Sequence, residues 1–342
     1  MIIYDENHKF SLYEFGIQIP VHNSRATRTF ENLKAHPVLG KRFDDWFLAK
    51  KDHRLEREDL ERAHDRTYVA KLFADGLESE IIKTFELIDA HGQYYRYKPQ
   101  TATLPLAVLF ERILDRVAGT WQCCKAALES GFSFYFGGGM HHAQSDYGNG
   151  FCILNDIVIA ARKLQAEGDA QKVWVIDVDA HKGDGTAALT ADDDSIITLS
   201  AHMANGWPLD GSPRDSRGRL NPSFIPSNID VPVSAGEDRL YVRKLEEGLS
   251  KLDVYPRPDI AIVVSGADPY ENDELPSTSD LRLTLEQLFE RDKLVYHFLK
   301  QRNIPRAYLM AGGYGDSAWQ VYTQFLEWVL LDHLGLDRSE PS

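Results

Sequence analysis

The sequence predicts a single α/β domain built on a parallel sheet, and three observations support this prediction. From Gly131 onward, short apolar runs of strand length alternate with segments of helical periodicity, which is the pattern of βαβ units. The run Val173 to Asp177 is apolar almost throughout, as expected for a parallel strand buried on both faces. No internal repeat or linker divides the 342 residues, so we expect one domain over residues 1–336 and a flexible tail at 337–342.

The expected elements follow in chain order. A short apolar strand is expected at residues 1–4. Apolar spacing at i, i+3 and i+4 predicts helices at 27–33, 41–49, 56–63, 67–73, 78–88 and 106–128. Apolar runs of strand length predict strands at 133–136, 173–177, 196–200, 260–265 and 307–310, with helical spacing at 155–165, 240–252, 281–300 and 317–331. Residues 205–228 have no regular period, and so long a loop in a compact domain is usually functional or disordered.

Composition narrows the class of protein. The formal net charge of -14 argues against a protein that coats nucleic acid or anionic lipid, whereas it would attract a cationic side chain or amine. No apolar run reaches the length of a membrane span and the first residues lack a basic leader, so we expect a cytoplasmic protein. Cys123, Cys124 and Cys152 lie in apolar surroundings without metal-type spacing, and we expect them to pack as small hydrophobic residues.

Every strand expected in the second half ends in residues that are unusual for a buried core. The five ends are followed by GGGMHH at 137–142, DVDAHKGDG at 177–185, SAH at 200–202, SGADP at 265–269 and AGGYG at 311–315. Ligands of open parallel sheets bind beyond the carboxyl ends of the strands. We therefore expect these five ends to share one crevice.

Three of these residues form a set of zinc-ligand type. Asp179, His181 and Asp268 supply two carboxylates and an imidazole, which would leave one coordination position open for water and substrate. If the strand geometry persists, its period of two places Asp177 on the same face as Asp179 and His181. The alternative is that this motif only caps the strand and the helix that follows, with Asp184 as a cap residue. The matching chemistry at four other strand ends favours the metal site.

The remaining strand ends supply groups for proton transfer. His141 and His142 follow three glycines, which let the backbone bend sharply, and a neutral imidazole there could take a proton from water and return it to a leaving amine. Asp177 and Asp184 are expected to fix the tautomers of these rings. Tyr314, flanked by glycines, is expected to be an exposed phenol on a flexible turn that donates a hydrogen bond to an oxyanion.

These motifs resemble the zinc-dependent histone deacetylase family, in the broad sense that includes bacterial deacetylase-like amidohydrolases and acetylpolyamine amidohydrolases. The matching stretches are GGGMHHAQSDYGNGFCILND at 137–156, VIDVDAHKGDGT at 175–186, TLSAH at 198–202, SGADP at 265–269 and AGGYG at 311–315. The first 130 residues match weakly, around 63–69. The resemblance implies the arginase/deacetylase fold, a single catalytic domain with a central eight-stranded parallel sheet flanked by helices. Two motif variants, GGG-x-HH and Asp-Ala-His, resemble the small class IV-like members most.

The resemblance also implies the roles of the catalytic residues. Asp179, His181 and Asp268 correspond to the zinc ligands, and Tyr314 to the phenol that polarises the acyl carbonyl. His142 corresponds to the general base and acid and is partnered by Asp184. His141, partnered by Asp177, lies beside it.

Further positions correspond to the substrate tunnel and to a structural cation. Phe151 and Trp207 would wall the narrow tunnel that holds the apolar stem of an acyl-lysine, with Gly150 and Gly312 beside the substrate. A monovalent cation, K⁺ or Na⁺, would be held by Asp177, Asp179, Ser200 and the backbone of His181 and Ala201.

The chain departs from the family pattern at three places. Lys182 stands where many members have a second histidine, which we expect to alter the surroundings of the ligands without removing one. Trp207 and Pro208 stand where a phenylalanine is commoner, so the resemblance does not fix the width of the tunnel. The acidic rim residue that grips the substrate backbone has two candidate counterparts, Asp89 and the segment 94–97.

The activity implied by the resemblance is removal of acetyl or other acyl groups from the amine of lysine side chains in proteins or peptides. A deacetylase of acetylpolyamines or other small acylated amines is the main alternative, and a catalytically silent acyl-lysine binder is a more distant one. The sequence leaves open whether the chain forms a homo-oligomer.

Two other activities would also use carboxylates at the end of the strand 173–177 to hold a metal. A sugar transferase could use Asp177 and Asp179 to hold a metal and a nucleotide diphosphate, but this leaves Tyr314 and the tandem histidines unexplained. A binuclear manganese ureohydrolase would need further carboxylates around Asp179, and the motif fits one metal better.

Overall fold

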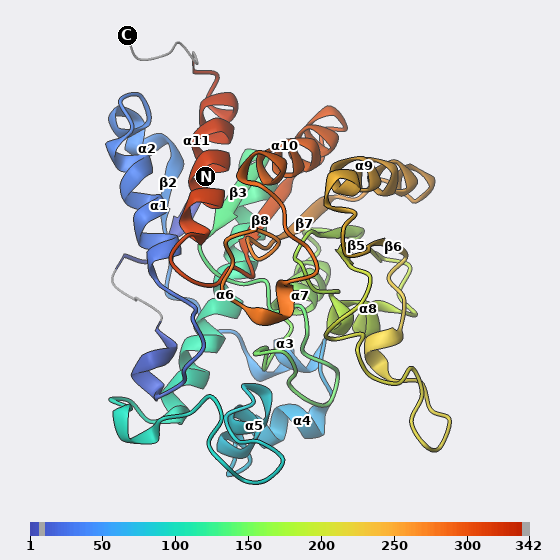
Figure 1. Ribbon diagram of the computed structural model, residues 1–342. Coiled ribbons are helices and arrows are strands. Elements are labelled where there is room, and N and C mark those ends of the chain that lie inside the picture. The colour runs from blue at the N-terminus through green and yellow to red at the C-terminus, as the bar shows by residue number, and fades with distance from the viewer. Residues whose placement is uncertain (7–10, 337–342) are drawn as a thin grey trace.

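A wholly parallel sheet of eight strands forms the centre of the structure, in the order β2-β1-β3-β8-β7-β4-β5-β6 (Figure 1). The computed structural model describes residues 1–6 and 11–336, so the tail expected at 337–342 lies outside the described residues. The strands are β1 (Ile2–Tyr4), β2 (Phe47–Ala49), β3 (Phe132–Tyr135), β4 (Val173–Asp177), β5 (Ile196–Met203), β6 (Ile229–Val233), β7 (Ile260–Ser265) and β8 (Arg306–Met310). The predicted α/β class is confirmed.

Helices cover both faces of the sheet. α1 (Ser24–Ala35), α9 (Tyr241–Lys251), α10 (Leu285–Gln301) and α11 (Ala318–His333) pack on one face, and α6 (Leu106–Ser130) and α7 (Asp156–Glu167) on the other (Figure 1). The shorter helices are α2 (Phe43–Trp46), α3 (Arg57–Glu61), α4 (Arg66–Leu72), α5 (Leu77–Thr84) and α8 (Asp184–Thr190). A further apolar cluster joins α3, α4 and α5 to α6 and α7.

Successive residues of β4 pack on opposite faces of the sheet. Trp174 and Ile176 belong to the cluster with α1, α9, α10 and α11, whereas Val173 and Val175 belong to the cluster with α6 and α7. Because both faces are covered, every residue of β4 is buried. This explains why β4 is apolar up to its last residue, Asp177, and does not alternate with polar residues.

Residues 41–49 do not form the helix that the sequence predicts. α2 ends at Trp46, and the three residues that follow form β2, which pairs in parallel with β1. The rings of Phe43 and Phe47 stack with centroids 4.7 Å apart. The i, i+4 spacing of these two rings therefore spans a junction between helix and strand. Pairing with the edge of β1 outweighs the local preference of residues 47–49 for a helix.

Further elements differ from the prediction. β5 continues to Met203, so the residues 200–202 lie within the strand and not beyond its end. β6 is absent from the prediction because Asp230 and Pro232 interrupt its apolar run, and it forms at the edge of the sheet, where a proline is tolerated. The helix expected at 78–88 ends at Thr84. Glu86 has a φ of 52° and begins a hairpin-like loop, in which Ile88 and Tyr94 form an antiparallel bridge.

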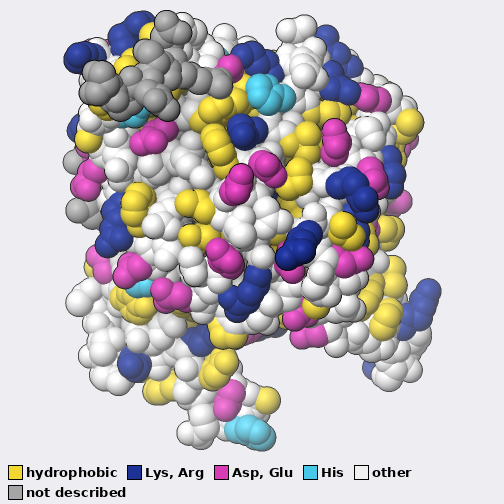
Figure 2. Space-filling model, turned by 45° about the horizontal axis from the view of Figure 1, so that its top comes forward, with side chains coloured by type: hydrophobic (Ala, Val, Ile, Leu, Met, Phe, Trp, Pro, Cys, Tyr) yellow, Lys and Arg dark blue, Asp and Glu magenta, His cyan; other side chains and the backbone are white. Residues whose placement is uncertain are grey.

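All three cysteines are buried and free of disulfide bonds, as the sequence predicts. Within residues 1–6 and 11–336, no helix combines the length and the apolar character that crossing a bilayer requires. On the face shown in Figure 2, Lys and Arg side chains are interspersed with Asp and Glu. No single sign of charge dominates this face, so attraction of a charged ligand to it would depend on the individual side chains around the binding site.

A buried histidine links the segment between α3 and α4 to the start of α7. The Nδ1 atom of His64 lies 2.9 Å from the carbonyl oxygen of Gln144, and its Nε2 atom accepts a hydrogen bond of 2.9 Å from the backbone N–H of Asn155. Asn155 is the N-cap residue of α7. Burial lowers the pKa of His64 to about 4, because the charged form of the ring loses its hydration in the interior. Protonation of Nε2 would also break the hydrogen bond from Asn155.

We predict that acid destabilises the fold through His64. Its folded pKa lies below the ordinary value of 6.5, so its stabilising neutral form is fully present above pH 6.5 and is lost as the pH falls toward 4. The wild type should lose roughly 2–3 kcal/mol more unfolding free energy between pH 7 and pH 4.5 than the variant His64→Gln. Urea unfolding at the two pH values measures this difference, and equal losses in both proteins would contradict it.

Candidate active site

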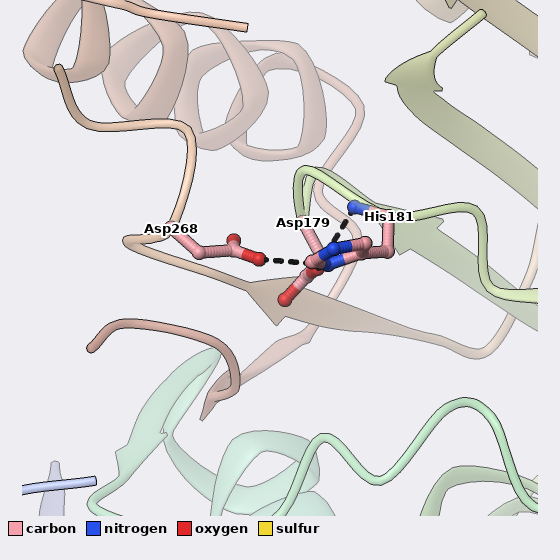
Figure 3. Close-up of side chains that lie close together, drawn as sticks. All are labelled: Asp179, His181 and Asp268. Carbon is pink, nitrogen blue, oxygen red and sulfur yellow. Dashed lines mark hydrogen bonds and ion pairs between the residues drawn. The ribbon is translucent and has the colours of Figure 1, made fainter. Parts of the chain in front are cut away.

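Asp179, His181 and Asp268 meet at the carboxyl ends of two neighbouring strands, β4 and β7 (Figure 3). One ligand atom from each residue lies within 4.8 Å of the others, and all three side chains are buried. His181 Nδ1 is 3.1 Å from Asp268 Oδ2 and 3.4 Å from Asp179 Oδ1. The structure thus brings the three residues predicted as metal ligands into one group that could hold a metal ion.

The electrostatics of this group favour a cation. Two carboxylates buried side by side are unfavourable unless positive charge compensates them. Burial and the charge of Asp179 raise the pKa of Asp268 to about 6. Burial by itself would lower the pKa of His181, but the bonds to both aspartates outweigh it and raise this pKa to about 10. Either a proton on His181 or a bound metal ion can supply the charge.

The donor set and the surrounding backbone fit a divalent metal ion. Two carboxylates and one imidazole are donors found in catalytic zinc sites, where three protein ligands leave one position open. A Cβ atom at Gly266 or Gly312 would lie 2.4 or 2.5 Å from Asp179 Oδ2. Only glycine therefore lets the backbone approach the carboxylate so closely.

The carboxylates are held in place by backbone amides and by a buried arginine. Three backbone N–H groups each donate a 3.0 Å hydrogen bond to Asp179 or Asp268. Arg291 of α10 donates to the carbonyl oxygens of Val178 and Gly266 at 3.1 and 2.7 Å, which ties the end of β4 to the end of β7. Sequence reasoning missed Arg291, because it lies in a charged stretch that resembles an exposed helix face, yet its side chain is fully buried.

The tandem histidines form two separate pairs with carboxylates. His141 Nδ1 is 2.6 Å from Asp177 Oδ2, and His142 Nδ1 is 2.7 Å from Asp184 Oδ1. Burial and the charge of His141 lower the pKa of His142 to about 4. Burial opposes protonation of His141 too, but Asp177 and Asp179 outweigh it and raise its pKa to about 9. The two adjacent rings therefore differ in charge near neutral pH.

Asp184 has more partners than the sequence indicates. Its Oδ2 atom accepts hydrogen bonds from Gln144 Nε2 at 3.0 Å and from Ser223 Oγ at 2.7 Å. Asn149 Nδ2 donates a longer bond of 3.3 Å. These contacts hold the carboxylate so that it faces His142. They come from loops distant in sequence, so no local pattern reveals them.

Tyr314 is half-buried, which corrects the expectation of an exposed phenol on a flexible turn. Its backbone N–H donates to Asp273 Oδ2 at 2.7 Å, and its ring packs against the apolar cluster that includes α4 and α5. Burial, together with the charges of Asp268 and Asp179, raises the pKa of Tyr314 well above its usual range. The phenol therefore keeps its proton, which leaves the hydroxyl able to donate a hydrogen bond.

Two adjoining cavities lead to these residues. The outer cavity, of about 160 Å³, is lined by Phe151, Trp207, Gly150, Leu275 and Tyr314, among others. The inner cavity, of about 100 Å³, shares Phe151, Gly150 and Tyr314 with it and includes Gly312. The ring of Trp207 lies 4.5 Å from that of His142 and 5.4 Å from that of His181, measured between centroids. All four residues predicted to contact substrate therefore line one passage.

The rim of the outer cavity includes one residue of a predicted rim segment and one residue that no motif indicates. Glu86 and Arg96 line it, and Arg96 comes from the candidate segment 94–97. Asp89, the other candidate, accepts hydrogen bonds at 2.9 Å from the backbone N–H groups of His91 and Gln93. It shapes the turn of the loop and does not line the cavity.

Lys182 does not belong to the group of possible metal ligands. The buried Lys182 donates through Nζ to the carbonyl oxygens of Ser223 and Ile225, at 3.2 and 2.7 Å, and so binds the long loop 205–228. Asp177 and Ser200 are register partners on β4 and β5, next to the buried Ala201. A monovalent cation between them stays a prediction.

Comparison with known proteins gives the family. Residues 19–328 match the histone deacetylase domain. The chain belongs to the histone deacetylase family. The resemblance drawn from its motifs is thereby confirmed, and the parallel sheet is the arginase/deacetylase fold of this domain. The alternative of a sugar transferase finds no support in this match.

Three relatives illustrate the range of the histone deacetylase family. An uncharacterized protein of Picosynechococcus sp. is 34% identical over 212 residues, covering 62% of this chain and 65% of the relative. Histone deacetylase 2 of Arabidopsis thaliana is 30% identical over 226 residues, which cover 66% of this chain and 55% of the relative. The acetoin utilization protein AcuC of Staphylococcus aureus is 32% identical over 188 residues, which cover 55% of this chain and 47% of the relative. The chain thus spans about half to two thirds of the length of the curated relatives it matches.

Replacing one residue of this candidate metal site should separate metal binding from folding. In the chelator-treated protein, Asp268→Asn removes one of two repelling buried carboxylates, so we expect an unchanged or higher Tm. Added Zn²⁺ should raise the wild-type Tm, since binding at about a thousandfold excess over Kd stabilises by about 4 kcal/mol. The variant should lose this increase, which differential scanning fluorimetry measures.

The matched control is Asp253→Asn, which removes an exposed carboxylate that pairs with Arg302. This control should keep the Zn²⁺-dependent increase in Tm. An Asp268→Asn protein that binds one zinc per chain with wild-type affinity would remove Asp268 from the ligand set.

Proposed function

We propose that this chain is a zinc-dependent deacylase that hydrolyses the amide between an acyl group and the amine of a lysine side chain. The observation that carries the proposal is that a neutral His142, the Tyr314 phenol and His181 of the ligand group line one passage. The reaction consumes one water and breaks the C–N bond, leaving a carboxylate and a protonated amine. When bound by Asp179, His181 and Asp268, zinc would supply Lewis acidity toward the acyl carbonyl and toward water.

His142 is the proton carrier of this proposal. Its Nδ1–H group donates to Asp184, which leaves the lone pair on Nε2 to accept a proton. With its pKa lowered to about 4 by burial and by the charge of His141, the ring is neutral before reaction. It takes a proton from the attacking water and returns it to the amine nitrogen as the C–N bond breaks.

Tyr314 stabilises the developing oxyanion. Because its pKa is raised well above the usual range, the hydroxyl carries a proton that it can donate to the acyl oxygen. A fixed donor aimed at charge that develops in the transition state is worth two to three orders of magnitude in rate.

The passage suits the aliphatic stem of the substrate. The rings of Phe151 and Trp207 and the side chain of Leu275 supply apolar walls. A Cβ atom at Gly150 would lie 2.2 Å from Trp207 Cη2, so glycine at this position lets the Trp207 ring lie directly against the backbone. An alkyl chain can lie between these walls with its amide at the bottom and its polar head at the rim.

The proposal has three further parts. Residues 1–336 are the catalytic domain, and a cytoplasmic location agrees with the unpaired thiols. A structural K⁺ or Na⁺ would be held by Asp177, Asp179, Ser200 and the backbone of His181 and Ala201. Among the residues that the structure describes, one group of three metal-type ligands is present, which favours a single catalytic metal over the binuclear ureohydrolase alternative. The deacetylase named among the relatives supports the reaction class.

Two substitutions test the catalytic assignments. Tyr314→Phe and His142→Ala should each lower kcat for an acetyl-lysine peptide at least about a hundredfold, because each removes a proton donor or acceptor without removing a ligand. Steady-state kinetics measure the rate, and elemental analysis should find zinc at the wild-type ratio. Tyr255→Phe, a hydroxyl deletion away from the passage, is the control.

Near-wild-type turnover in either variant would refute the role given to that residue. A zinc-loaded wild type that hydrolyses neither acyl-lysine peptides nor small acylated amines, yet binds them, would favour the silent acyl-lysine binder.

A further inference from the structure

Two opposite charges stand at the mouth of the passage. Glu86 and Arg96 line the same outer cavity as His142, Trp207 and Tyr314. Their side chains form an ion pair and are 47% and 25% exposed. The mouth therefore presents one carboxylate and one guanidinium side by side, and both can be reached from solvent.

The backbone fixes both charges in place. They occupy opposite ends of the hairpin-like loop, in which the N–H group of Tyr95 donates to the carbonyl oxygen of Leu87 at 3.0 Å. The carbonyl oxygen of Arg96 accepts a 2.9 Å bond from the N–H group of Gln18, which anchors the loop to the body of the protein. Glu86 has a φ of 52°, a conformation that non-glycine residues adopt mainly at functional sites and turns.

Arg96 also contacts the wall of the passage directly. Its guanidinium carbon lies 5.2 Å from the centroid of the Phe151 ring and 5.0 Å from that of the Tyr95 ring. Phe151 has a φ of 65° and donates its N–H group to the carbonyl oxygen of Thr84 at 3.2 Å. The cation is therefore held against the ring that would cover the alkyl stem of the substrate.

We propose that this mouth recognises a zwitterionic head group, so that the preferred substrate is a free Nε-acyl-lysine. The proposal rests on the deacylase function given above. The substrate α-carboxylate would bind Arg96, whose planar fork suits bidentate contact with a carboxylate, and the α-ammonium would bind Glu86. Both charges of an amino acid then meet complementary charges.

The energetics favour an exchange of partners at the mouth. An exposed ion pair contributes little to stability, so separating Glu86 from Arg96 costs little. A zwitterion replaces this pair with two charge-assisted contacts. A lysine within a peptide has neutral amides at both positions, so it offers no charge to compensate either side chain.

Four substrates measure the contribution of the α-carboxylate and of the α-ammonium group one at a time. They are Nε-acetyl-lysine, its carboxamide, its Nα-acetyl derivative and N-hexylacetamide, which has no head group. For the wild-type enzyme with zinc, removing either charge should lower kcat/KM about tenfold, mainly by raising KM, because a charge-assisted contact made in the ground state and in the transition state is lost.

Two variants assign each charge to its residue. Arg96→Gln should abolish the preference for the free carboxylate over the carboxamide, and Glu86→Gln the preference for the free ammonium over its acetylated form. Arg302→Gln is the matched control. Arg302 also pairs with a carboxylate, that of Asp253, with 30% and 49% exposure, and its guanidinium carbon lies 3.7 Å from the centroid of the Phe298 ring. This variant should keep both preferences.

The outcomes distinguish the head-group proposal from the proposed function. Hydrolysis of all four substrates within about twofold, or a preference for the carboxamide, overturns zwitterion recognition and leaves the deacylase intact. If an acetyl-lysine peptide is hydrolysed but none of the four is, zwitterion recognition is overturned and the deacylase stands. If the peptide is not hydrolysed either, the proposed function fails, and calorimetry of Nε-acetyl-lysine and its carboxamide on the wild type decides the binding question. Equal affinities overturn recognition, and a carboxamide about tenfold weaker supports it.

Discussion

The placement of two buried carboxylates side by side is the constraint on which the rest of the site depends. Asp179 and Asp268 repel each other in a region that solvent does not reach, which is why the pKa of Asp268 is raised to about 6 by burial and by its neighbour. Positive charge must be supplied locally, by His181 with a proton or by a metal ion. The backbone N–H groups around both carboxylates, and the glycines that let the backbone come so close, follow from this requirement.

The same requirement explains how distant elements are tied to the strand ends. Arg291 joins the ends of β4 and β7 from α10, so the spacing of the two aspartates depends on a helix that follows both strands in the chain. Lys182, next to His181 in sequence, donates to the carbonyl oxygens of Ser223 and Ile225 in the loop 205–228. That loop also supplies Ser223 to Asp184, the partner of His142. Lys182 therefore supports the position of His142 indirectly, through the loop that also carries Trp207.

The sequence predicts those parts of the structure that local patterns determine. β4 and β7 have the predicted bounds, because each is a continuous apolar run that ends abruptly in polar residues. β2 and β6 escape prediction, because they are edge strands whose formation depends on a partner strand. In the site, motifs point to the ligands and to the tandem histidines. Arg291, Asp273 and Glu86 could not be predicted, since each acquires its place through contacts between segments far apart in the chain.

The two ends of the passage are constrained to different degrees, and this difference bears on how specificity can arise. At the bottom, the carboxylates and imidazoles are buried and mutually dependent, so changing one leaves another charge uncompensated, at a cost of several kcal/mol. At the mouth, Glu86 and Arg96 form a partly exposed pair, whose separation costs little. Substitutions at the mouth can therefore alter which head group is accepted without disturbing the chemistry, because solvent can compensate a charge there and cannot do so at the ligands.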